Sequence, residues 1–148
     1  MVTRAIWASV VLGALFAATL PAGIKEVLAE PNLEKRARLA LDNAESSYQS
    51  ARTAYEAGNT TTVAASLHEL QESIEVAYAS LESTGKDPRK SPKWFKKAEM
   101  QTRDLVRRLS SFRDSMSFDD RAVVDPVQAK VQQVHDELLM GLMEGKRK

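Results

Sequence analysis

The sequence predicts an all-α protein, an up-down-up-down four-helix bundle preceded by an N-terminal signal segment. Three observations lead to this prediction. Apolar residues recur at steps of three and four in four successive stretches, a spacing that places each set on one face of a helix. Glycine, proline and capping residues separate those stretches. A run without any charge, from Ala5 to Leu20, precedes them all.

The first 29 residues have the layout of a secretory signal. Arg4 comes before the uncharged run, Pro21 ends it, and Val27-Leu28-Ala29 offers small residues at the −3 and −1 positions of a cleavage site. We therefore expect residues 1–29 to be a signal peptide and residues 30–148 to be one exported domain, periplasmic or secreted. The alternative is an uncleaved N-terminal membrane anchor, because the uncharged stretch approaches the ~20 residues that cross a bilayer.

The first two helices are predicted from their apolar stripes and from the glycines that follow them. The first stripe is Leu33, Ala37, Leu41, Ala44, Tyr48, Ala51 and Tyr55, and the second is Val63, Leu67, Leu70, Ile74, Ala77 and Leu81. Gly58 stands where a left-handed helix end belongs, and Thr60 or Thr61 is expected to cap the second helix. Gly85 is expected to end it.

The third and fourth helices follow the same pattern. Their stripes are Trp94, Ala98, Thr102, Leu105, Leu109, Phe112 and Met116, and then Val124, Val127, Val131, Val134, Leu138 and Leu142. Ser91-Pro92 and Asp125-Pro126 each predict a capping residue followed by a first-turn proline. Residues 117–124 fit either a separate short turn or a kinked start of the last helix. Since all connections are short, consecutive helices are expected to run antiparallel.

The residues that usually carry catalysis or bind metals do not form a known pattern. His68 and His135 are the only histidines, and Glu72 stands where a zinc-protease helix needs its second histidine. Neither histidine follows a glutamate by three residues, as di-iron bundles require. The chain has no cysteine, which excludes disulfides and a c-type haem. We expect no enzyme, no cofactor and no metal, with both histidines at the surface or at the rim of the core.

Charge is distributed unevenly along the chain. Residues 30–148 carry equal numbers of basic and acidic side chains, which argues against a nucleic-acid partner. Within them, residues 30–85 have a net charge of −5, residues 86–113 of +7 and residues 114–148 of −2.

An antiparallel bundle brings the basic segments to one end. The candidate binding residues there are Lys35, Arg36, Arg38, Lys86, Arg89, Lys90, Lys93, Lys96 and Lys97, with Lys146, Arg147 and Lys148 of the tail nearby. One hypothesis is that they bind an anionic membrane surface, an envelope polymer or an acidic protein. The competing interpretation is that they only pair with the acidic neighbouring helices. A bundle that carries a small molecule or a metal is the alternative function.

Overall fold

The structure is a computed structural model that describes residues 23–146. Most of the predicted signal segment, residues 1–22, and the last two residues of the tail lie outside the described part. The helices are α1 (Ile24–Ala29), α2 (Leu33–Glu56), α3 (Thr60–Ser83), α4 (Lys93–Ser115), the 3₁₀ helix η1 (Phe118–Val123) and α5 (Asp125–Glu144). The protein is therefore all-helical over this range, with four long helices packed together, as the sequence predicts.

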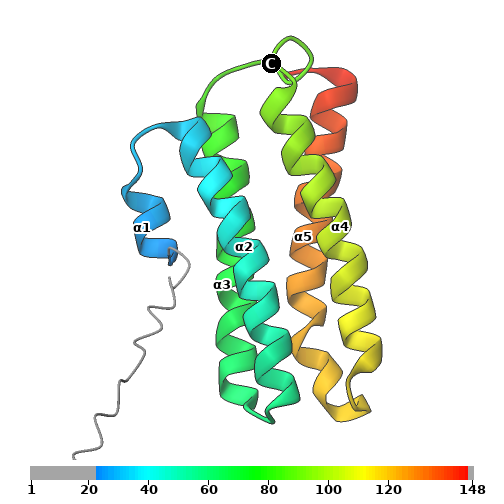
Figure 1. The fold of residues 1–148 in the computed structure, drawn as a ribbon. Coiled ribbons are helices and arrows are strands. Elements are labelled where there is room, and N and C mark those ends of the chain that lie inside the picture. Colours follow the sequence, from blue (N-terminus) through cyan, green and yellow to red (C-terminus); the bar gives the residue numbers. More distant parts are fainter. Residues whose placement is uncertain (1–22, 147–148) are drawn as a thin grey trace, which may run out of the picture.

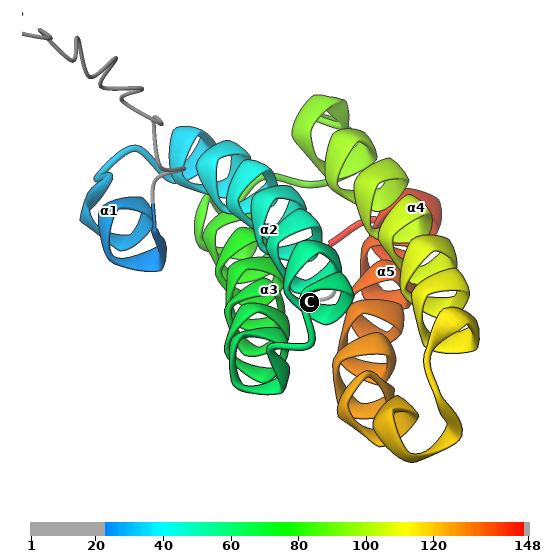
Figure 2. The same ribbon diagram turned by 60° about the horizontal axis from the view of Figure 1, so that its bottom comes forward.

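The long helices form two hairpins that pack side by side (Figure 1). α2 and α3 make one hairpin and α4 and α5 the other, and α5 lies against α3 while α4 contacts both helices of the first pair. Figure 2 shows the two pairs as neighbouring layers, with the short helix α1 on the outer side of the first pair. Consecutive long helices run antiparallel, so the start of α2, the end of α3, the start of α4 and the end of α5 share one end.

The predicted stripes supply most of the core. The second stripe is buried along its whole length, and so is the fourth except for Leu142, which is half-buried. α2 buries small residues beside its predicted stripe, namely Ala40, Asn43, Ser47 and Ala54. α3 does the same with Ser66, Ser73 and Ser80. These short side chains allow α2 and α3 to approach each other closely along the first hairpin.

The glycines predicted to end α2 and α3 do so, whereas the residues predicted to cap the starts of the helices differ from those observed. Gly58 and Gly85 both adopt positive φ, of 74° and 68°, at the ends of α2 and α3. The cap of α3 is Asn59 and not a threonine, since its side chain accepts a hydrogen bond of 3.1 Å from the Thr62 amide. Asn59 precedes the first helical residue, Thr60, and asparagine is preferred over threonine at this capping position.

The last two helices begin one residue away from the predicted positions. α4 starts at Lys93 with Pro92 as its cap, and Ser91 makes no capping hydrogen bond. α5 starts at Asp125 itself, whose carboxylate pairs with Arg113 and does not cap the helix. The ambiguous segment before it forms the separate turn η1. Among the helices of residues 23–146, none combines the length and the hydropathy needed to span a bilayer.

Candidate functional site

The nine basic residues proposed from the sequence lie at one end of the bundle, which we call the basic pole. It consists of Lys35, Arg36 and Arg38 from α2, Lys86, Arg89 and Lys90 from the link between α3 and α4, and Lys93, Lys96 and Lys97 from the first turns of α4. These segments meet at the upper end of the molecule in Figure 1, next to the end of α5. The antiparallel topology thus gathers charges that lie as far apart in the sequence as Lys35 and Lys97.

Three of the nine are occupied by partners within the chain. Lys35 forms an ion pair of 3.0 Å with Glu30, whose backbone carbonyl accepts a hydrogen bond of 2.8 Å from Nε of Arg36. Lys86 forms an ion pair with Glu34. The hydrogen bond from Lys35 lowers the pKa of Glu30, and the bond from Lys86 lowers the pKa of Glu34. The Lys86–Glu34 pair connects the link to the start of α2, and the contacts of Glu30 hold the turn that precedes α2.

The other six cations are exposed and have no carboxylate within 4 Å among residues 23–146. They are Arg38, Arg89, Lys90, Lys93, Lys96 and Lys97. They therefore remain available to bind a negatively charged group from outside the chain.

The contrast is sharpest within α4 itself. The four arginines further along this helix all have carboxylate partners: Arg103 with Glu99, Arg107 with Asp104, Arg108 with Glu45, and Arg113 with Asp125. The three lysines of its first turns have none within the described residues. Pairing with acidic neighbouring elements, the competing interpretation of the charge pattern, thus accounts for Arg108 and Arg113. Arg103 and Arg107 pair within α4, and the three lysines have no carboxylate partner within 4 Å among the described residues.

An aromatic side chain lies among these lysines. Nζ of Lys93 and Nζ of Lys97 lie 4.9 Å and 5.5 Å from the centroid of the Trp94 ring, which is half-buried. Trp94, which the sequence predicts at the start of the core stripe, packs against the core but is only partly buried, and the adjacent Phe95 is the more deeply buried ring, with 3% of its surface exposed. The wholly apolar phenylalanine fills the core, and the indole stays at the rim where cations can stack on it.

The link between α3 and α4 is a folded turn that packs on the end of α5. The Asp87 carbonyl accepts hydrogen bonds from the amides of Lys90 and Ser91, at 3.1 Å and 2.9 Å. Pro88 is buried, and a Cβ on Gly141 of α5 would lie only 3.2 Å from its ring. The absence of a side chain at Gly141 thus allows the link to lie close to α5, a role that the sequence did not reveal.

Acidic side chains line the other side of the same end. A cavity of about 370 Å³ lies between the end of α3, the link and the end of α5. Its charged lining is formed by Glu82, Glu137, Glu144, Lys86 and Lys146. Nζ of Lys146 donates a hydrogen bond of 3.1 Å to the Gly85 carbonyl, so this tail lysine supports the end of α3. Of the six exposed cations of the basic pole, all but Arg38 lie on the link or on α4.

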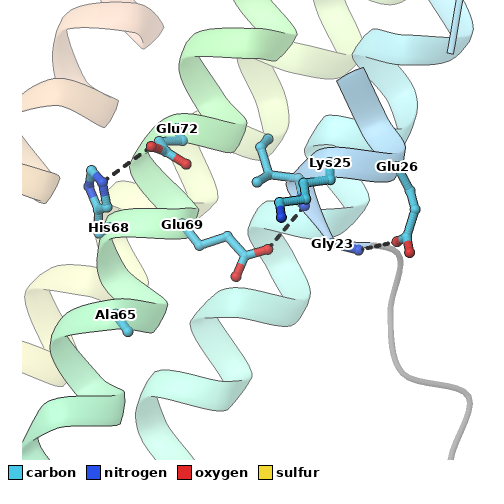
Figure 3. A pocket seen from close by; sticks show the side chains of 8 residues that line it. Gly23, Lys25, Glu26, Ala65, His68, Glu69 and Glu72 are labelled. Atoms are coloured by element: carbon cyan, nitrogen blue, oxygen red, sulfur yellow. Dashed lines mark hydrogen bonds and ion pairs between the residues drawn. The ribbon is translucent and has the colours of Figure 1, made fainter. Parts of the chain in front are cut away.

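The two histidines occupy different environments. The His68 side chain is 70% exposed, and its Nε2 lies 3.2 Å from a carboxylate oxygen of Glu72, beside the shallow pocket drawn in Figure 3. His135 lies at the rim of the core, where Nε2 is 3.1 Å from a carboxylate oxygen of Glu99 on α4. No cluster of three or more acidic or histidine side chains within residues 23–146 is arranged to hold a metal ion.

Three polar side chains of the core, Asn43, Ser73 and Thr102, are hydrogen-bonded to neighbouring side chains or to the backbone. Nδ2 of Asn43 donates to Ser73 Oγ at 2.8 Å and to a carboxylate oxygen of Glu69 at 3.1 Å. The Ser73 hydroxyl donates to the Glu69 carbonyl, and the Thr102 hydroxyl to the carbonyls of α4 one turn earlier. A carrier would use polar groups of this kind to bind its ligand. Here their hydrogen-bonding capacity is already used by neighbouring side chains and by the backbone.

The end opposite the basic pole carries a second polar cluster. The Tyr55 hydroxyl and the Ser117 hydroxyl both donate to Oδ2 of Asp120, at 3.1 Å and 2.6 Å, and the Ser117 amide donates to the Tyr55 oxygen. These bonds join the end of α2 to η1. The cluster therefore explains why the ambiguous segment forms a separate, fixed turn.

Comparison of the chain with protein family models, with curated proteins and with solved structures finds no match in any of the three.

Proposed function

We propose that the protein is an exported, non-enzymatic helical bundle that binds an anionic surface or partner through the basic pole. The observation that carries the proposal is the contrast within α4, where four arginines have carboxylate partners and three lysines have none. Those lysines also stand in the first turns of a helix, where the helix dipole disfavours positive charge by ~0.3 kcal/mol or more each. Because no carboxylate within 4 Å among the described residues offsets this cost, the position of these lysines supports a role toward an outside ligand.

The arrangement of the pole also suits such a ligand. The link and the start of α2 are held by the ion pairs of Lys35 and Lys86 and by the packing of Pro88, so the six exposed cations are attached to a firm scaffold. A firm scaffold loses little conformational entropy when it binds. Membrane headgroups, an acidic envelope polymer and an acidic protein remain the three candidate partners.

The proposal is tested by binding of the purified protein to vesicles with and without anionic lipid, and to polyglutamate as a model of an acidic polymer. We expect binding to at least one of the anionic probes and none to the neutral vesicles. Binding should weaken as salt is added, because exposed charges are screened beyond about 8–10 Å near physiological ionic strength. Equal binding to neutral and anionic vesicles, or no binding to any anionic probe at low salt, would contradict the proposal.

The second candidate function is a bundle that carries a small molecule or a metal. The hydrogen-bonded state of Asn43, Ser73 and Thr102 speaks against it. Metal analysis and an absorption spectrum of the protein purified from its host decide between the two. A stoichiometric metal or a coloured ligand would favour the carrier over the binding surface.

A further inference from the structure

The short helix α1 is built into the domain, although it lies within the predicted signal peptide. Val27 is fully buried in the same apolar core as α2 and α3, and Ile24 packs against that core. Figure 1 shows α1 alongside the upper half of the first hairpin. Leu28, the next residue, points outward with 52% of its surface exposed. One face of α1 therefore belongs to the core and the other faces solvent.

A polar contact fixes the beginning of this helix. The Ile24 amide donates a hydrogen bond of 3.2 Å to Oε1 of Glu69 on α3, and the same oxygen accepts a hydrogen bond from Asn43 on α2. Figure 3 shows the Glu69 side chain reaching from α3 toward the first turn of α1. Glu26 closes that turn by accepting a hydrogen bond of 2.6 Å from the Gly23 amide. One carboxylate thus joins α1, α2 and α3.

The segment after α1 is equally well connected. Glu30 pairs with Lys35, and its carbonyl accepts from Arg36, so the turn between α1 and α2 is held on both sides. Removal of residues 1–29 would leave this turn with nothing before it. It would also uncover the apolar surface that Val27 covers and remove one hydrogen-bond donor from Glu69.

We propose that α1 is retained in the mature protein, so that any processing of the N-terminal segment occurs before Gly23 and not after Ala29. Val27 then has a structural role, because its compact apolar side chain packs in the core against α2 and α3. This inference is independent of the basic pole, because none of the six exposed cations contributes to the α1 contacts.

The first test is the intact mass of the protein, expressed from its full coding sequence and recovered from an exporting host. We expect a chain that begins at Gly23 or earlier. A chain that begins at Glu30 would overturn the inference and confirm the cleavage site predicted from the sequence.

A pair of substitutions provides the second test. Val27→Ala and Leu28→Ala both keep a small residue near the predicted cleavage site, so neither should block processing. If α1 is retained, Val27→Ala leaves a cavity in the core and lowers the Tm by roughly 3–8 °C, while Leu28→Ala leaves the Tm unchanged within about 1 °C. Equal Tm values for the wild type and both variants would show that α1 is absent from the folded domain.

Discussion

Replacing Asn43 with alanine removes the side chain at the centre of the buried polar cluster between α2 and α3. Its amide nitrogen donates to Ser73 and to Glu69, and only 4% of the residue is exposed. The direction of these bonds follows from the chemistry. The Ser73 hydrogen is used on the Glu69 carbonyl, so the Ser73 oxygen accepts from Asn43. Without Asn43, this oxygen and the Glu69 carboxylate each lose a donor.

The expected cost is about 1–3 kcal/mol, the range for buried polar groups that lose a hydrogen-bond partner. Alanine also favours the helix over asparagine by up to ~0.7 kcal/mol, which partly offsets this cost. Asp42→Ala is the matched control, because Asp42 is the preceding residue of α2, is exposed and has a similarly low helix propensity. We expect the control to be as stable as the wild type or slightly more stable.

The assay is urea unfolding followed by circular dichroism for the wild type, Asn43→Ala, Ser73→Ala and the double variant. Because the two side chains share a hydrogen bond, the cycle should give a coupling free energy of about 0.5–2 kcal/mol. A coupling free energy near zero would refute the assignment of this cluster. So would an Asn43→Ala variant as stable as the Asp42→Ala control.

Four further variants test other parts of the structure. Leu109→Asp places a carboxylate at a fully buried position and should cost several kcal/mol, so that the far-ultraviolet helix signal is largely lost, whereas His68→Ala should leave the Tm unchanged. Phe95→Ala should cost about 3–5 kcal/mol in urea unfolding, as expected for a core aromatic, and a cost below about 1 kcal/mol would show that it does not begin the core stripe. Glu45→Gln removes the carboxylate that pairs with Arg108. The hydrogen bond from Arg108 lowers the pKa of Glu45, so the pair stabilises the folded state above the pKa of the unfolded chain and loses this effect as the pH falls through the folded pKa. The variant should therefore be less stable than the wild type by less than about 1 kcal/mol at neutral pH, and equally stable once the carboxyl is protonated. A difference in Tm that persists unchanged in acid would contradict this.

The core could be predicted because burial on a helix follows a period that the sequence displays. Each of the four stripes contains residues that the structure buries, and Gly58 and Gly85 mark helix ends because positive φ favours glycine. The deeper burial of Phe95 relative to Trp94 could not be predicted. Adjacent positions differ by only 100° around the helix, and both rings are large and apolar, so the period alone does not choose between them.

The candidate site also has one feature that the sequence predicts and others that it does not. Its location at one end follows from the order of the helices and the signs of the charges. Which cations are paired depends on the register between helices: Arg108 meets Glu45, sixty-three residues earlier in the chain, because α4 packs across α2. The close approach of Pro88 to Gly141 is another contact between distant segments that no local pattern encodes. Likewise, the burial of Val27 depends on how α1 docks, whereas its sequence is typical of a cleavage site.

Binding by the lysines of the basic pole is measured most directly by comparing two triple variants that change the net charge equally. Lys93→Glu, Lys96→Glu and Lys97→Glu reverse the charge of the basic pole, whereas Arg52→Glu, Arg107→Glu and Lys130→Glu reverse paired cations elsewhere.

Partitioning onto anionic vesicles at low salt is measured for both, together with the Tm. Each cation near an anionic surface contributes about 1 kcal/mol to binding. We therefore expect the basic-pole variant to lose partitioning by at least roughly 100-fold. Its Tm should be unchanged or slightly higher. The control variant should lose much less. Equal losses for the two variants, or a clear fall in Tm for the basic-pole variant, would contradict a binding role for these lysines.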